Sequence, residues 1–538
     1  MDRIVLNGHN LTIKDVVRVA REGVQVEIAQ ESRDEINRVR AYVEENWIRE
    51  DAPATYGFNT GLGKLKDFTI TMEQNDEFQK RAIFSHAACV GVPLSEDVVR
   101  AGMLVRINAL CQGVSGLRMQ TLDRLVEMLN KGVHPVIPSQ GSVGACGDLG
   151  PLSHMVAVLM GHYEAEAYYQ GERMSAPEAL ERAGITPIEY QLKAKDALAL
   201  INGTTIFTGM AALNCSDAEQ LIKQSEIVSA LSLEAMRGEQ AAFDPRIQTV
   251  RKHNGQVKTA DNVRRLIKGT QRATEECRKV HLKNDIMHPV YQPRVQDLYS
   301  LRCVPQVNGA CRDNLDYVKR TLEEEINAAT DNPLVFWDET GEKLEFLSGG
   351  NFHGEPVAFA MDILAMSLAE IGNISERRSF SICDPTLSYG LPPMLSGEPH
   401  GLNCGYPVIT CSAAALASEN KTLCFPASAD SIPTKSNQED HVSMAPWACR
   451  KTKQIIDNLY KILGIEYLAA ARAIWITQDV LGEFGLGEGT KVAYQLLVDN
   501  VPYEKDDVYL QRQCVPAIRM TEEGTILKAV EEALGIEL

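Results

Sequence analysis

Six short polar segments interrupt a chain that is otherwise rich in apolar residues. Each one holds side chains that can move a proton, bind a carboxylate or form amide hydrogen bonds. The segments are Tyr56–Gly63, Gly141–Leu152, Asn202–Thr204, Gln296–Arg302, Ser348–Pro356 and Asn437–Pro446. Taken singly, each is more typical of a turn, a helix cap or a solvated loop. Together they supply an acid or base, a guanidinium and amides, which are the groups that a polar active-site pocket needs.

One of these segments carries a cysteine in a run of small residues. Cys146 lies in Gly-Ala-Cys-Gly, and Asp148 with Pro151 marks the start of a helix just after it. A helix N-terminus favours negative charge and lowers the pKa of a nearby thiol. From the residues alone, Cys146 is therefore either a candidate nucleophile or part of a glycine-rich turn.

Two further patterns have both a functional and a structural interpretation. Gln296, Tyr299 and Arg302 are spaced by three residues, so one helical turn would place all three on one face. Tyr56 stands beside three glycines, and His86 follows Ser85 near the end of a polar stretch. Taken alone, such a tyrosine and such a histidine are more often packed or hydrogen-bonded structural residues than catalytic ones.

Composition and motif searches exclude several classes of function. The 538 residues carry a formal net charge of −18, which argues against nucleic acid as a partner. The chain has no run of five basic residues and no stretch of 18 apolar ones, so we expect no membrane partner. The thirteen cysteines are odd in number and form no Cys-x-x-Cys, which predicts free thiols, no metal site and a cytoplasmic location.

The elements that must position these residues change in character along the chain. Arg3–Leu6 and Val24–Ile28 have strand-like patterns, and Asp34–Trp47 has a helical one. Beyond about residue 200 the pattern is helical and unusually apolar around most of the helix circumference, at Ile227–Met236, Val357–Ile371, Ala413–Ala417 and Ile455–Ile476. Helices of this kind are buried on all sides. They predict a large bundle that other subunits complete, and a domain boundary near residue 200.

The six segments, in this order, resemble the aromatic amino acid ammonia-lyase and aminomutase family, and among its members the histidine-specific lyases. The resemblance runs from about residue 50 into the C-terminal region. It implies a mainly α-helical fold of the L-aspartase and fumarase type. Residues 1–200 would form a smaller α+β domain, and residues 201–538 a long central helical bundle with a C-terminal extension. A homotetramer with sites shared between subunits is also implied.

The family builds an electrophilic cofactor from its own backbone. In the family an Ala-Ser-Gly tripeptide cyclises and dehydrates to 4-methylidene-imidazole-5-one, and Ala145, Cys146 and Gly147 occupy the matching positions here. The central residue departs from the family pattern, but the chemistry still permits the group. The nitrogen of Gly147 would attack the carbonyl of Ala145 with loss of water. Cys146 would then lose hydrogen sulfide where serine loses water, and the product is the same.

The resemblance also implies roles for individual residues. Tyr56 matches the base that removes the substrate's β-proton, and Arg302 matches the guanidinium that binds the carboxylate. Family residues that orient substrate and cofactor correspond to Asn202, Gln296 and Tyr299, and Phe352 corresponds to a residue packed beside the cofactor. His86 and Glu439 match side chains that contact the substrate's ring.

The substrate implied is L-histidine, which would give trans-urocanate. A buried glutamate at 439 suits an ionisable imidazole better than a phenyl ring. Against this, Leu387–Pro392 looks more like the tyrosine enzymes, and Lys283–Pro293 looks like an insertion that can change a lid. Two alternatives therefore stay open: a lyase or 2,3-aminomutase acting on another amino acid such as L-tyrosine, and a catalytically silent binding or assembly relative.

Overall fold

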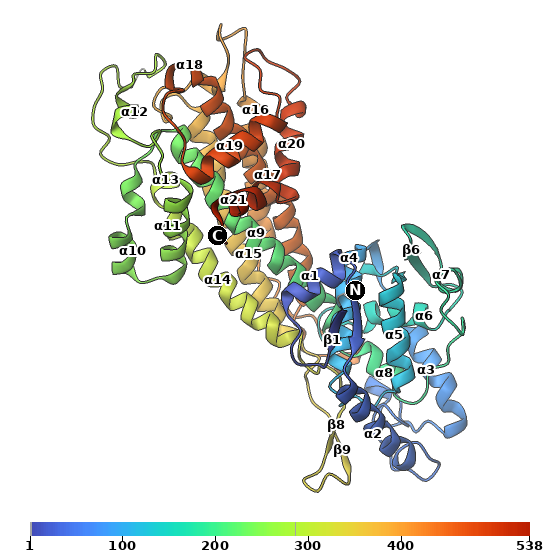
Figure 1. Cartoon of the computed structure of the whole chain (residues 1–538). Helices are drawn as coiled ribbons and strands as arrows, with labels where there is room; N and C mark the ends of the chain where they lie inside the picture. Colours follow the sequence, from blue (N-terminus) through green and yellow to red (C-terminus); the bar gives the residue numbers. More distant parts are fainter. Residues whose placement is uncertain (1–2, 286) are drawn as a thin grey trace. The chain divides into compact units, whose positions relative to one another are not determined.

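The computed structural model describes residues 3–285 and 287–538, and helices dominate it (Figure 1). The chain forms two compact units, each assembled from three segments. Unit 1 comprises Met1–Ser216, Val318–Asp362 and Pro426–Arg450, and unit 2 comprises Asp217–Tyr317, Ile363–Phe425 and Lys451–Leu538. The mainly helical fold that the sequence predicts is confirmed. The division into domains 1–200 and 201–538 stays a proposal, because it describes chain order and these units interleave.

Unit 1 mixes helices with short strands, and it holds every strand of the described residues. The strands are β1 (Arg3–Leu6), β2 (Gln25–Ile28), β3 (Val90–Pro93), β4 (His134–Pro135), β5 (Pro138–Gln140), β6 (Glu166–Tyr169), β7 (Glu172–Ser175), β8 (Leu334–Trp337) and β9 (Leu344–Leu347). They pair as parallel β1-β2 and antiparallel β3-β5, β4-β6-β7 and β8-β9. The helices are α1 (Ile13–Arg21), α2 (Gln30–Asn46), α3 (Met72–His86), α4 (Glu96–Leu110), α5 (Met119–Lys131), α6 (Leu149–Leu159), α7 (Ala176–Arg182) and α8 (Asp196–Ile201), with 3-10 turns at Gly63–Leu65 and Lys435–Asn437.

Helices are the regular elements of unit 2, and its described residues form no strand. Its own helices are α10 (Pro245–Arg251), α11 (Asn254–Leu266), α12 (Glu275–Lys279), α13 (Tyr299–Arg302), α16 (Pro407–Leu423), α18 (Gln478–Leu481), α19 (Glu488–Asn500), α20 (Gln511–Glu522) and α21 (Thr525–Leu534), with 3-10 turns at Gln240–Phe243 and Pro393–Leu395. Four long helices have residues in both units: α9 (Thr205–Ala235), α14 (Val304–Glu325), α15 (Glu355–Cys383) and α17 (Ala445–Ile476).

A bidentate ion pair lies in the core of unit 2. The guanidinium of Arg378 on α15 donates to Glu466 on α17 at 2.5 and 2.8 Å, and both side chains are 0% exposed. The hydroxyls of Ser232 on α9 and Ser375 on α15 each donate to the same carboxylate at 2.6 Å. Because a charge buried without partners is costly, this network fixes how the three apolar helices pack against one another.

The expectation that the apolar helices are buried on all sides holds for α9 and α17 far better than for α15 and α16. Phe359 and Met366 of α15 are 49% and 50% exposed, and α16 buries only Ile409, Ala413 and Asn420. In one chain these two helices therefore keep exposed apolar surface, and completion of the bundle by other subunits stays a prediction. By length and composition α15 could cross a membrane, but 72% of its apolar window is buried inside the structure, as in a core helix.

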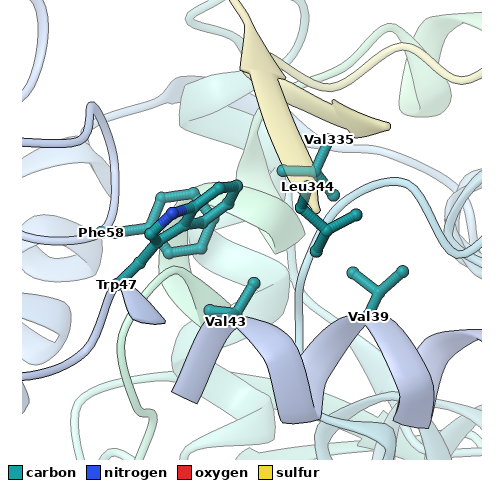
Figure 2. Packing of buried hydrophobic residues seen from close by; sticks show 6 residues of the cluster. All are labelled: Val39, Val43, Trp47, Phe58, Val335 and Leu344. Carbon is teal, nitrogen blue, oxygen red and sulfur yellow. The ribbon is translucent and has the colours of Figure 1, made fainter. Parts of the chain in front are cut away.

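An aromatic and aliphatic cluster in unit 1 supports the loop that bears Tyr56. Phe58 packs edge-on against Trp47, with ring centroids 5.1 Å apart, and Val43 of α2 is fully buried beside them (Figure 2). The hairpin β8-β9 completes the cluster with Val335 and Leu344. Since Phe58 is 1% exposed, the backbone two residues before it is held in place by the core.

Candidate active site

A large pocket in unit 1 brings together most of the residues that the sequence singles out. Its volume is about 1530 Å³. The predicted site residues that line it are Tyr56, His86, Ala145, Cys146, Asn202, Phe352 and Glu439. They come from loops and helix ends that are as much as 383 positions apart in sequence (439 − 56). The structure therefore confirms that these segments meet, although the sequence alone could only infer this from the resemblance.

The loop at the centre of the pocket is tightly wound. Cys146 and Gly147 have positive φ angles of 49° and 55°. A Cβ atom at residue 147 would stand 1.6 Å from the carbonyl oxygen of Gly203, so only glycine fits there. The N–H of Asp148 donates to the same carbonyl at 2.6 Å. These contacts draw the backbone of the Ala-Cys-Gly tripeptide into a turn and leave no room for a side chain at its last residue.

Asp148 connects this loop to α9. Its carboxyl oxygen Oδ2 accepts from the N–H groups of Ile206 and Phe207 at 2.8 and 3.1 Å, in the first turn of that helix. Asp148 also occupies the N-cap position of α6, as the sequence predicts, but its side chain makes no capping bond there. Burial raises the pKa of Asp148 to about 7, against which the two backbone hydrogen bonds act only in part.

The thiol of Cys146 is not activated. Burial raises its pKa to about 12, and the nearby Lys435 only partly offsets this effect. Burial therefore opposes the lowering of this pKa that a helix N-terminus suggests, because it disfavours the thiolate. The raised pKa does not support Cys146 as a nucleophile.

Asn202 lines the pocket and keeps one buried amide acceptor without a partner. It follows α8 directly and is 4% exposed. Its Nδ2 donates to the backbone oxygen of Asn332 at 3.0 Å, whereas its Oδ1 is buried with no hydrogen-bond partner. An unpaired buried acceptor is costly, so Oδ1 is suited to an N–H or O–H donor that enters the pocket.

Tyr56 lines the pocket, and its surroundings disfavour the ionised form of its hydroxyl. Its hydroxyl accepts from the N–H of Gly63 at 3.1 Å. Burial raises its pKa above the usual value, and the negative charges of Asp331 and Glu439 act in the same direction. A basic Tyr56 therefore needs positive charge from another source.

The acidic side of the pocket is built around Glu439, which is 9% exposed. Its Oε1 accepts from the ammonium of Lys435 at 2.7 Å, and its Oε2 accepts from the hydroxyl of Thr434 at 2.5 Å. Burial works to raise its pKa, but hydrogen bonds from Cys146, Lys435 and Thr434 outweigh it and leave the pKa lowered. Glu439 is therefore ionised.

His86 lies at the end of α3 with one ring nitrogen already engaged. Its Nδ1 is 2.7 Å from the carbonyl oxygen of Ala82 and 3.0 Å from the hydroxyl of Ser85. Burial lowers its pKa, and the positive charge of Lys435 lowers it further. The ring is therefore neutral, with the proton assigned to Nδ1, and Nε2 is left as an acceptor.

Three predicted residues belong to unit 2 and do not line this pocket. Arg302 stacks over the ring of Tyr299 at 4.5 Å and donates from Nε to the carbonyl oxygen of Asp297 at 3.0 Å. Tyr299 is 72% exposed. The expected single helical face is wrong for Gln296, because α13 begins only at Tyr299. Gln296 instead lines a separate cavity of about 240 Å³ in unit 2.

Lys435 is the pocket residue that the sequence analysis missed. It lies four residues before Glu439, the spacing at which a lysine and a glutamate pair on a helix. The spacing alone is a weak signal, because the surrounding residues show no helical pattern. The pairing here comes from a 3-10 turn at Lys435–Asn437 and not from an α-helix.

Comparison with known proteins decides the family. The family model described as aromatic amino acid lyase matches residues 11–498. This chain belongs to that family. It is 44% identical to the histidine ammonia-lyase of Alkaliphilus oremlandii over 537 residues, which is 100% of both chains. Membership makes it a carbon–nitrogen lyase.

Solved structures of family members have the same fold. The tyrosine aminomutase of Streptomyces globisporus matches with a TM-score of 0.90 and 35% identity, over 100% of both chains. The histidine ammonia-lyase of Trypanosoma cruzi matches with a TM-score of 0.86 and 35% identity, over 99% of this chain and 96% of that one. The predicted ammonia-lyase fold is thus confirmed.

Proposed function

We propose that this lyase eliminates ammonia from L-histidine and forms trans-urocanate. The observation that carries the substrate is Glu439, an ionised and nearly buried carboxylate in the same pocket as Tyr56 and Cys146. A phenyl ring offers such a carboxylate no partner, whereas an imidazole N–H does. The relatives named histidine ammonia-lyase, at 42–45% identity over the full chain, support the same substrate.

We propose that Ala145, Cys146 and Gly147 mature into 4-methylidene-imidazole-5-one. The residues fit this group: the turn is tightly wound, Gly147 has no room for a side chain, and the free Oδ1 of Asn202 lines the same pocket. Once formed, the group supplies an electrophile that makes the substrate's amine a leaving group. Maturation removes one water and one hydrogen sulfide. An intact mass lower by that sum is expected, and an active preparation with the uncyclised mass would refute the proposal.

The chain's own residues carry out the remaining steps. Tyr56 takes the β-proton, Arg302 binds the carboxylate through its planar fork, and Tyr299 orients the substrate. Asn202 and Gln296 orient substrate and cofactor, and Phe352 packs beside the loop of Cys146. His86 and Glu439 hold the imidazole ring.

Since Gln296, Tyr299 and Arg302 do not line the pocket of unit 1, we place them in the site of another subunit within a homotetramer. The 72% exposure of Tyr299 and the exposed apolar residues of α15 support such an assembly. All thirteen cysteines are free, which is in keeping with a location in the reducing cytoplasm.

A second candidate is a lyase or 2,3-aminomutase acting on L-tyrosine. The tyrosine aminomutase that matches over the full chain favours it. To decide, the purified protein is incubated separately with L-histidine, L-tyrosine and L-phenylalanine, and ammonia, conjugated acid and β-amino acid are measured. Ammonia and urocanate from histidine are expected. Ammonia from tyrosine but not from histidine, or a β-amino acid product, would overturn the assignment.

Glu439→Gln gives an independent test of the substrate. The amide keeps the shape but loses the charge that holds the ring. We expect kcat/KM for histidine to fall about 10- to 100-fold, because a hydrogen bond to a charged group contributes about 1.5–3 kcal/mol. An unchanged kcat/KM would contradict a role for Glu439 in binding imidazole.

A further inference from the structure

Lys435 reaches the pocket from a strained turn. Lys435, Ser436 and Asn437 all have positive φ angles, of 43°, 57° and 59°, although none is glycine. Such a backbone costs free energy at each residue, and it persists only where the surroundings impose it. Here the N–H of Thr434 donates to the carbonyl oxygen of Glu439 at 2.9 Å and closes the turn. The turn places the ammonium 2.7 Å from the Glu439 carboxylate, in the pocket wall.

The hydrogen-bonding groups around Glu439 in the pocket comprise two acceptors and one cationic donor. Glu439 is an acceptor, and His86 presents a free Nε2 acceptor once its Nδ1 is engaged by Ala82. Lys435 is the cationic donor beside them. Neutral imidazole has one N–H donor and one bare nitrogen, whereas imidazolium has two donors and no acceptor. Without Lys435 the two acceptors would favour imidazolium. With it, Glu439 and Lys435 match the one donor and the one acceptor of the neutral ring, and His86 contacts the ring without a hydrogen bond.

The charges lead to the same conclusion. Glu439 faces Lys435 on its own turn, His86 of α3, and Cys146 and Tyr56 of two loops. Of these, only Lys435 is a cationic side chain, and its charge opposes that of Glu439. A bound imidazolium would leave one uncompensated positive charge, whereas a neutral ring leaves none.

We propose that Lys435 sets the protonation state in which the substrate's ring binds, so that the pocket takes neutral imidazole with its N–H on Glu439 and its bare nitrogen on the Lys435 ammonium. The inference rests on the proposed histidine substrate and makes Lys435 a specificity-determining residue. If Lys435 is removed, the ring is expected to bind Glu439 with one more proton than in the wild type, as imidazolium. Lys435→Arg keeps the charge and the donor.

The direct test is calorimetry of imidazole itself, which binds to the side-chain subsite without any reaction. Titrations in two buffers of different ionisation enthalpy give the number of protons exchanged. The wild type is expected to release a proton at pH 6, where free imidazole is mostly protonated, and none at pH 8. Lys435→Met is expected to take up a proton at pH 8 and to release none at pH 6. Lys435→Arg should behave as the wild type.

Lys66→Met is the matched control, since Lys66 also lines the pocket but pairs with Asp67. It should exchange protons as the wild type does. The pH optimum of kcat/KM for histidine is expected to move down by about one unit in Lys435→Met and to stay in place in Lys435→Arg. If kcat/KM of Lys435→Met is instead lower than that of the wild type by the same factor at every pH, Lys435 has only a structural role.

The outcomes separate this inference from the proposed function. Wild-type protein that binds imidazole with this proton exchange but releases no ammonia from histidine would refute only the proposed reaction. Histidine turnover with the same proton exchange in Lys435→Met as in the wild type would refute only the role of Lys435. No binding of imidazole to the wild type, or Lys435→Arg behaving as Lys435→Met, would also refute it.

Discussion

In the proposed maturation, one atom of Cys146 changes the group that leaves without changing the product. The sulfur is the leaving group in that scheme, so the high pKa of the thiol matters less than the bond between sulfur and Cβ. Cys146→Ser should mature with loss of a second water in place of hydrogen sulfide. We expect an intact mass two waters below the sequence mass and a kcat equal to that of the wild type, because the finished group is identical.

Cys146→Ala is the control for that experiment. Alanine has no β-substituent to expel, so this variant should keep the methyl group and lose turnover. Mass spectrometry and ammonia release measure both variants. A mature, active Cys146→Ala chain, or a Cys146→Ser chain that forms a different product, would contradict this scheme.

The proposed role of Tyr56 as the base predicts the pH dependence of the reaction. Burial raises its pKa, and a base must be deprotonated, so kcat/KM should rise from neutral into alkaline pH. Tyr56→Phe removes the base and should lower kcat about 10²- to 10⁴-fold. Tyr42→Phe, in the aromatic cluster, is the control and should leave the rate unchanged. Activity that falls as pH rises from 7 to 9 would exclude Tyr56 as the base.

At the scale of elements, the sequence predicts what depends on neighbouring residues. It locates β1, β2 and most of α2, and it places the start of α6 at Asp148 and Pro151. It could not predict that the Asp148 side chain binds α9, because that contact depends on how helices pack. It also missed that α13 begins only after Gln296, and that Lys435 lies in a turn of positive φ angles that residues other than glycine rarely adopt.

Asp148 allows a test of that packing. Asp148→Ala leaves the N–H groups of Ile206 and Phe207 without an acceptor and should destabilise the fold by about 1–3 kcal/mol for each. Asp148→Asn keeps an acceptor oxygen for these N–H groups but has no carboxyl group to titrate, so it serves as the control for pH dependence. The folded pKa of about 7 exceeds the usual 3.8, so the folded wild type binds a proton more tightly than the unfolded chain.

The wild type should therefore lose stability as pH rises from about 4 to 7, and Asp148→Asn should not. Thermal unfolding at several pH values measures the difference in Tm between the two proteins. We expect the Tm of Asp148→Asn, relative to the wild type, to increase across this window and then to stay level. A constant difference would show that Asp148 is ionised in the folded protein.

At the scale of the whole molecule, the net charge says less about the pocket than the positions of the individual charged residues do. The net charge of −18 coexists with a pocket whose wall carries Lys64, Lys66, Arg81 and Lys435. The exposed Phe359 and Met366 of α15 are apolar surface that a tetramer would cover. The sequence predicted apolar helices that need partners, but whether a partner is in the same chain or in another is a property of the assembly.

Shared sites make a prediction about mixed tetramers. Tyr56→Phe lacks the proposed base, and Arg302→Gln lacks the guanidinium proposed to bind the carboxylate, so each variant alone should be nearly inactive. If each site takes Tyr56 from one subunit and Arg302 from another, random co-assembly makes about a quarter of the sites intact. Co-expressed, differently tagged chains purified through both tags should regain about that fraction of wild-type activity. Tyr56→Phe co-expressed with the double variant provides no intact Tyr56 and should stay inactive, and inactivity of the first mixture would mean that each chain builds its site alone.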